Sequence, residues 1–236
     1  MTSPLSSKPQ MHGINQGTAP QEAWRPPVRP GEPAPDFTLP VVGQEGTISL
    51  SDFKGRQPVF LGMFRGLYCA FCRRAIAQMA VTRERLGDVG VESLAIVATD
   101  LENARLYFTY RPMRVRVAVD PECVTHGSYG VPRPEPTPEL VQTVTNLRVN
   151  PTGELPEPLP VPQAAMELDR LQGYEQTPRD HVDFERTFTQ MIGAFLVDRD
   201  GIVRWTDIEC GREGLSGFGK FPATEHVLDA ARQMLA

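Results

Sequence analysis

Pro58-Val59-Phe60-Leu61-Gly62-Met63-Phe64 is a short run of apolar residues, and Cys69-Ala70-Phe71-Cys72 follows it closely. The apolar run is typical of a buried β-strand. Residues 70–86 then place apolar side chains at helical spacing, namely Ile76, Met79, Ala80 and Leu86. A strand that leads into a helix through two cysteines favours an α/β fold, with the two thiols at the turn between the elements.

The cysteine pair has the spacing that dithiol–disulfide chemistry needs. Cys69 is expected at the N-terminus of the helix, where the helix dipole favours a thiolate, and Cys72 lies one turn further on, within reach of a disulfide. We take both as catalytic candidates. Although close cysteine pairs also occur in zinc sites, the strand-to-helix setting favours redox chemistry. Three neighbouring arginines would add electrostatic support: Arg65, Arg73 and Arg74.

The rest of the chain alternates between apolar segments typical of strands and amphipathic segments typical of helices. We expect a hairpin turned at Asp198-Arg199-Asp200-Gly201 near the C-terminus. This order predicts an α/β domain with a mixed central sheet flanked by helices. The expected strands are 36–39, 46–50, 58–64, 91–98, 114–119, 191–198 and 201–207, and the expected helices are 70–86, 100–110, 121–129 and 224–235.

Two segments fall outside this pattern. Residues 1–30 are polar and rich in Pro, Ser, Gly and Gln, so we expect a disordered N-terminal tail followed by one domain over residues 31–236. Residues 131–190 carry ten prolines, and we interpret them as an insertion in that domain. Helices are expected at 164–171 and 181–190. We expect the insertion to be mobile and dispensable for folding.

Composition excludes several classes of function. A chain of 236 residues can form one domain with a full core, and its net charge of −5 offers no basic surface for nucleic acid. No apolar run reaches the roughly eighteen residues of a membrane span. The N-terminus lacks the apolar stretch of a secretory signal, so we expect a cytoplasmic protein. In that reducing compartment, a close cysteine pair is more typical of a catalytic or metal site than of a structural disulfide.

The order of several motifs resembles that of the peroxiredoxin-like branch of the thioredoxin superfamily, the alkyl hydroperoxide reductase/thiol-specific antioxidant group. The resemblance covers residues 31–131 and 192–236 and leaves out the tail and the insertion. It implies a thioredoxin-like fold and thiol-based oxidoreduction, with no organic cofactor and no metal. The matching segments are 31–39, 48–55, 64–73, 119–121, 194–203 and Tyr129-Gly130-Val131.

Some positions depart from the pattern of this group. Typical peroxiredoxins carry a threonine three residues before the peroxidatic cysteine; aligned in this way, Cys72 is the peroxidatic residue and Cys69 replaces the threonine. The acidic residue expected three positions later falls at Ala75. The expected arginine falls at Ile192, which also replaces the cis-proline of thioredoxins. We therefore prefer the thioredoxin-like alignment, in which Cys69 is the nucleophile and Cys72 its partner.

The sequence thus predicts a thiol–disulfide oxidoreductase of the redoxin type, which reduces a disulfide or a peroxide. An external thiol system, such as thioredoxin or glutathione, would recycle it. Two alternatives stay open: a hydroperoxide-reducing peroxiredoxin with Cys72 as the peroxidatic cysteine, and a non-catalytic redoxin module that binds a partner or senses oxidation. Cys123 is a candidate resolving thiol, and Cys210 is expected to be structural. A zinc site of the four cysteines with His126, and a homodimer, are further alternatives.

Overall fold

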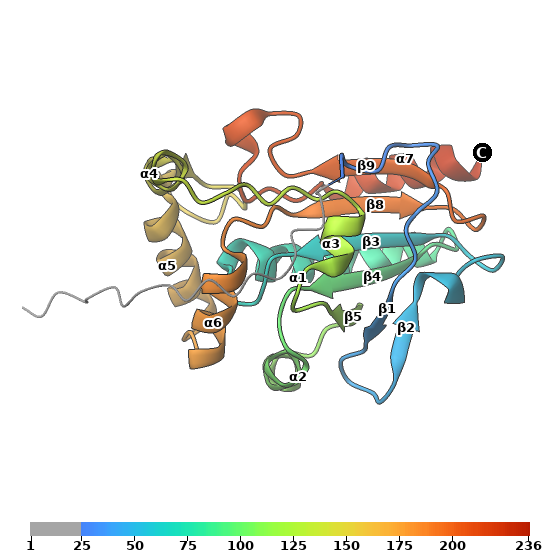
Figure 1. The fold of residues 1–236 in the computed structure, drawn as a ribbon, viewed down its shortest axis with the longest axis horizontal. Helices are drawn as coiled ribbons and strands as arrows, with labels where there is room; N and C mark the ends of the chain where they lie inside the picture. Colours follow the sequence, from blue (N-terminus) through green and yellow to red (C-terminus); the bar gives the residue numbers. More distant parts are fainter. Residues whose placement is uncertain (1–24) are drawn as a thin grey trace, which may run out of the picture.

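A five-stranded mixed sheet forms the centre of the computed structural model, which describes residues 25–236 (Figure 1). The strand order is β5-β4-β3-β8-β9. The parallel half consists of β3 (Val59–Phe64), β4 (Glu92–Val97) and β5 (Arg116–Val119). The strands β8 (Gly193–Val197) and β9 (Val203–Ile208) extend it in antiparallel fashion. The predicted mixed α/β sheet is confirmed.

Two apolar layers cover the faces of this sheet. On one face lie α1 (Ala70–Gly87), α2 (Leu101–Tyr110) and α7 (Thr224–Leu235). On the other face lies the hairpin of β1 (Thr38–Pro40) and β2 (Thr47–Ser49), together with the 3₁₀ turn η1 (Leu50–Asp52) and the segment after α3 (Val124–Ser128). The domain is therefore a sheet enclosed between a helical layer and a smaller hairpin layer.

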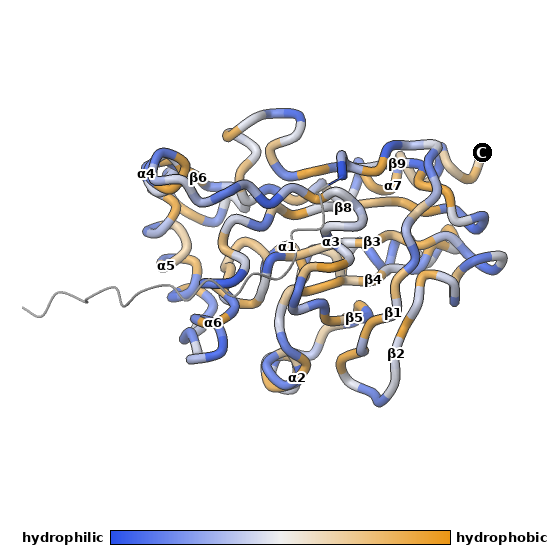
Figure 2. The backbone as a smooth tube through the Cα atoms, in the orientation of Figure 1, coloured by the Kyte–Doolittle hydropathy of each residue, from blue (hydrophilic) through white to orange (hydrophobic). Residues whose placement is uncertain are grey.

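The central strand β3 is apolar throughout because both of its faces are buried (Figure 2). Its side chains alternate between the two layers. Phe60 and Phe64 face the layer that contains α1, whereas Leu61 and Met63 face the hairpin layer. The strand β3 therefore contributes side chains to both cores, as do its neighbours β4 and β8.

The carboxyl ends of β3, β4 and β5 meet at one edge of the sheet, because parallel strands end on the same side. The loops that follow these three strands carry the candidate functional residues. Residues 65–69 lead from β3 into α1, residues 98–100 lead from β4 into α2, and residues 120–123 lead from β5 into α3. The two predicted catalytic cysteines therefore lie at this edge.

The insertion contains regular structure and packs on the domain. Its elements are α4 (Pro138–Asn146), β6 (Arg148–Val149), β7 (Leu159–Pro160), α5 (Val161–Gln172) and α6 (Pro178–Thr187), so both expected helices are present. Ala164 and Leu168 of α5 are buried in the same core as α1. We therefore revise the expectation of a dispensable loop, since α5 contributes to the main core.

The packed domain begins earlier in the chain than predicted. Val28 has no exposed surface, and its N–H donates to the carbonyl of Tyr129 at 3.1 Å. Gly31 N–H likewise donates to Val203 O at 2.7 Å. The packed domain therefore begins before residue 31, because this valine completes the hairpin layer. Residues 1–24 of the expected tail lie outside the described residues. Within residues 25–236, no helix has the length and apolarity to cross a bilayer.

Candidate active site

The structure brings Cys69 and Cys72 together at the start of α1. Cys69 is the N-cap of the helix, and its Sγ accepts a hydrogen bond from the backbone N–H of Cys72 at 3.2 Å. The first amides of a helix have no partner within the helix, so a cap that carries negative charge is favoured there. Cys69 is 7 % exposed and Cys72 is fully buried. The outer of the two thiols is therefore the one placed to ionise.

The pKa values of the two thiols are shifted in opposite directions. Burial opposes ionisation of Cys69, but hydrogen bonds from Cys72 and the charge of Arg65 outweigh it and lower the pKa of Cys69 to about 7. Burial raises the pKa of Cys72 well above its ordinary value, and its hydrogen bond to Cys69 raises that pKa further. Near neutral pH, Cys69 is therefore partly ionised, while Cys72 still holds its proton.

Arg65 is the arginine that lies beside the thiols. It is 4 % exposed, and its guanidinium forms a buried ion pair with Glu209, at the end of β9. Both cysteines raise the pKa of Arg65, as does Glu209, although burial opposes this. The guanidinium also lies over the ring of Phe218, 5.2 Å from its centre. Arg65 is thus a permanent positive charge in the site, as expected from the sequence.

Arg73 and Arg74 point elsewhere, which corrects their expected place beside the thiols. Arg73 is fully buried: it forms an ion pair with Asp169 of α5, and its guanidinium lies 3.7 Å from the ring centre of Tyr174. Arg74 Nε donates to Glu154 at 2.6 Å. Neither arginine is among the main groups that shift the pKa of Cys69. Both side chains bind the insertion to the first turn of α1.

Aromatic rings close the site around the two thiols. Tyr68 makes an edge-to-face contact with Phe184 of α6, with ring centres 5.3 Å apart. Phe71 makes a similar contact with Phe218 at 6.2 Å. Gly219 follows Phe218 with a φ of +75°, and a Cβ there would lie 3.1 Å from the Phe71 ring. The loop after β9 therefore approaches Phe71 closely only because residue 219 is glycine.

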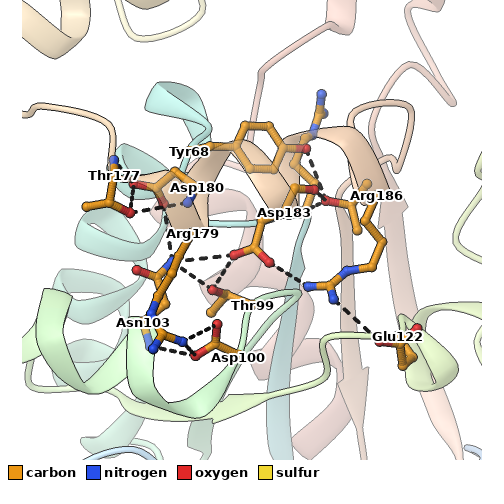
Figure 3. A network of polar contacts seen from close by, with 12 residues as sticks. Tyr68, Thr99, Asp100, Asn103, Glu122, Thr177, Arg179, Asp180, Asp183 and Arg186 are labelled. Carbon is orange, nitrogen blue, oxygen red and sulfur yellow. Dashed lines mark hydrogen bonds and ion pairs between the residues drawn. The ribbon is translucent and has the colours of Figure 1, made fainter. Parts of the chain in front are cut away.

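A buried polar network holds α6 against this edge of the sheet (Figure 3). Thr187 of α6 donates to the carbonyl of Arg65 at 2.7 Å and lies 3.2 Å from the Tyr68 hydroxyl. Thr99, in the loop after β4, donates to Asp183 at 2.5 Å, and the Asn103 amide lies 3.2 Å from Asp180. The insertion therefore packs directly behind the loop that carries the cysteines.

The other two cysteines follow different strands, and the pKa of each thiol is raised. Cys123 caps α3 in the left-handed conformation, with φ of 55°, and its burial raises its pKa to about 12. It follows β5, which lies two strand positions from β3 in the sheet. Cys210, after β9, is partly exposed, and burial raises its pKa to about 11. Among the described residues, no three cysteine, histidine or acidic groups converge as metal ligands would.

Glu209 is the site residue that sequence reasoning missed. Its side chain has no exposed surface, and it binds Arg65 and two backbone amides. In the sequence it is one acidic residue among many, in Ile208-Glu209-Cys210, far from the cysteine pair. Only the antiparallel addition of β8 and β9 beside β3 brings it to the thiols. One signal for it was present in the sequence: Arg65 directly follows a buried strand, and a buried arginine needs an acidic partner.

A family model described as the AhpC/TSA family matches residues 30–206. The chain belongs to the AhpC/TSA family. The matched range runs from before β1 into β9 and includes both cysteines of the pair. The resemblance drawn from the sequence motifs is confirmed, and the chain is a thiol-dependent oxidoreductase of the redoxin type. No sequence among curated proteins matches this AhpC/TSA chain.

Solved structures show the same fold. The reduced 2-Cys peroxiredoxin of Plasmodium vivax superposes with a TM-score of 0.56 at 14 % identity, covering 89 % of this chain and 83 % of the other. The mitochondrial 2-Cys peroxiredoxin of Plasmodium falciparum gives 0.54 at 13 % identity, covering 88 % and 94 %. Peroxidoxin BcpB of Mycobacterium tuberculosis gives 0.53 at 14 % identity, covering 88 % and 97 %. The predicted thioredoxin-like α/β fold of this AhpC/TSA member is thereby confirmed.

Proposed function

We propose that the protein is a thiol–disulfide oxidoreductase that uses Cys69 as nucleophile and Cys72 as the thiol that closes the disulfide. The observation that carries this assignment is the contact between Cys72 N–H and Cys69 Sγ at the start of α1. It stabilises charge on Cys69 alone. The lowered pKa of Cys69 and the raised pKa of Cys72 support the same division of roles.

With a disulfide substrate the reaction has two exchange steps. The Cys69 thiolate attacks one sulfur, a mixed disulfide forms, and the first substrate thiolate leaves. Cys72 then gives up its proton and attacks Cys69 Sγ, which closes the Cys69–Cys72 disulfide and releases the second substrate thiolate. The substrate gains two electrons, and an external reductant, either one dithiol such as thioredoxin or two molecules of glutathione, supplies two electrons that reduce the Cys69–Cys72 disulfide again.

With a hydroperoxide the same two cysteines suffice. The Cys69 thiolate attacks the terminal peroxide oxygen, the O–O bond breaks, and the alkoxide leaves as the alcohol after taking a proton. Cys69 is then a sulfenic acid. Cys72 attacks its sulfur, water leaves, and the same disulfide results. Membership of the AhpC/TSA family favours a peroxide as one natural oxidant.

The alternative assignment makes Cys72 the peroxidatic residue. Its full burial and its raised pKa disfavour this role, because both oppose formation of the attacking thiolate. The two departures noted in the sequence, Ala75 and Ile192, also leave no acidic residue and no arginine at the positions where the resemblance implies them.

The test runs peroxide and disulfide substrates side by side on the reduced protein. The variant Cys69→Ser should lose turnover with both, whereas Cys72→Ser should keep a fast-reacting thiol that accumulates a mixed disulfide. Cys123→Ser and Cys210→Ser are matched controls that should retain turnover. Peptide mapping of the oxidised protein should recover a bridge between residues 69 and 72. Fast peroxide consumption retained in Cys69→Ser would reassign the nucleophile to Cys72.

A further inference from the structure

We propose that Glu209 is a positioning residue of the thiol site, which holds Arg65 beside Cys69 and fixes the two backbone segments that close around it. The proposal rests on the assignment of Cys69 as the nucleophile. Three groups from separate parts of the chain meet at this one carboxylate, which is buried completely.

The first contact holds the positively charged guanidinium of Arg65 in place. Glu209 Oε2 binds Nη2 of Arg65, and both side chains are almost fully buried. The Nε of Arg65 is also buried, and it has no hydrogen-bond partner in the part of the chain that the structure describes. The guanidinium is thus held from one side by Glu209, while a donor nitrogen is left over for an oxygen or sulfur anion at the thiol.

The second and third contacts fix the backbone. Glu209 Oε2 also accepts from the N–H of Ile192 at 3.0 Å, and its Oε1 accepts from the N–H of Gly219 at 2.6 Å. The backbone N–H of Glu209 in turn donates to the carbonyl of Ile192 at 3.0 Å. The segment before β8 and the loop that covers Phe71 are therefore tied to the same carboxylate as Arg65.

Glu209 lies next to one of the two positions at which the resemblance implied a charged residue, because it accepts a hydrogen bond from the backbone of Ile192. The sequence lacks an acidic residue at Ala75 and an arginine at Ile192, the positions suggested by the resemblance. In the structure, a buried acid–arginine pair is present nonetheless, but it is built from Arg65 and Glu209, and the acid binds the backbone of Ile192 itself. The chain has thus placed the two charges on different elements at the same edge of the sheet.

The charges of Arg65 and Glu209 shift the pKa of Cys69 in opposite directions. The proposal therefore predicts an order of alkylation midpoints among variants of these two residues. Arg65 lowers the pKa of Cys69 and Glu209 raises it, with the arginine having the larger effect. The alkylation midpoint of Cys69 should therefore rise in the order Glu209→Gln, wild type, Arg65→Met/Glu209→Gln, Arg65→Met. Successive variants should differ by about half a pH unit. A residue with only a packing role would not produce this order.

The experiment measures iodoacetamide alkylation of the reduced full-length chain from pH 5 to 10, with peptide mapping to follow Cys69. It requires no substrate, so its failure is distinct from a failure of the proposed function. Glu213→Gln is the matched control, since Glu213 lies on the same loop but is exposed, and its ion-pair partner within residues 25–236 is Lys220. Its midpoint should equal that of the wild type.

A second measurement addresses the loop contacts. A glutamine cannot accept hydrogen bonds at both of its terminal atoms, so Glu209→Gln must lose either the Ile192 or the Gly219 contact. Hydrogen exchange of the Gly219 or Ile192 amide should accelerate by about tenfold or more in this variant, while Glu213→Gln leaves both unchanged. If Glu209→Gln does not fold, the order of the alkylation midpoints of the other three proteins still tests the proposal. A midpoint for Arg65→Met at or below that of the wild type would overturn the proposal, as would unchanged midpoints throughout.

Discussion

Arg65 and Arg73 are both buried arginines within a few residues of Cys69, yet their guanidinium groups bind different parts of the chain. Arg65 faces the loop after β9 and shares its charge between Glu209 and the thiols. Arg73 faces the insertion, where Asp169, Gln172 and the ring of Tyr174 take up its guanidinium. Positive residues near a thiol in the sequence therefore need not stabilise its thiolate. The partner that each arginine finds decides its role.

The largest effect that tests this comparison is the loss of Arg73. Arg73→Met leaves the Asp169 carboxylate without its partner, and breaking a buried ion pair costs about 3–5 kcal/mol of stability. Because Arg73 is bound by the insertion and is not among the main groups that shift the pKa of Cys69, the alkylation midpoint of the folded variant should stay near 7. Urea unfolding and the pH profile of alkylation measure the two quantities.

Arg83→Met is the matched control for that variant, since Arg83 lies on the same helix but is half exposed. It should cost well under 1 kcal/mol. An alkylation midpoint of Cys69 that rises by a full pH unit in Arg73→Met would show that both arginines act on the thiol. It would thus remove the difference in role between Arg65 and Arg73.

The next effect is the dependence of stability on pH. The pKa of Cys69 is lowered in the folded protein, so the folded state gains stability once the pH exceeds about 7 and loses it as the pH falls through that value. Between pH 6 and pH 8.5, the reduced wild type should gain about 2 kcal/mol relative to Cys69→Ser. The difference between their free energies of unfolding, measured under reducing conditions, checks this. A difference that shrinks with rising pH would mean that Cys69 is not the acidic thiol.

How much of this site follows from the sequence depends on how local each contact is. The strand, the cysteine helix and the acid strength of its N-cap depend on neighbouring residues, so Cys69, Cys72 and Arg65 could be predicted. The ion pairs depend on residues that the fold brings together from far along the chain, as Glu209 and Asp169 do, and no local pattern announces them. Proline density in the insertion correctly indicated little sheet, but it hid the apolar face of α5, where Ala164 and Leu168 are buried.

The smallest effect concerns the insertion itself. No residue of α4 is buried, whereas α5 and α6 are anchored by Arg73 and by the network around Asp183. Brief trypsin treatment should therefore cut first after Arg148, which is exposed, and leave Arg170 intact. Mass spectrometry of the fragments identifies the site. In Arg73→Met, cleavage after Arg170 should follow at a comparable rate. First cleavage within α5 of the wild type would contradict this division of the insertion.

The contact between Arg73 and α5 also links the reactivity of Cys72 to local opening of the protein. Arg73 follows Cys72 directly, and its guanidinium is bound by Asp169 and by the carbonyl of Leu67 at 2.5 Å. Fluctuations that lift α5 must therefore release the turn that buries Cys72, so the two segments form one cooperative opening unit. The free energy of that opening sets the rate at which Cys72 meets solvent. In the proposed mechanism, the rate at which Cys72 closes the disulfide would therefore depend on the local stability of a segment that lies outside the central sheet.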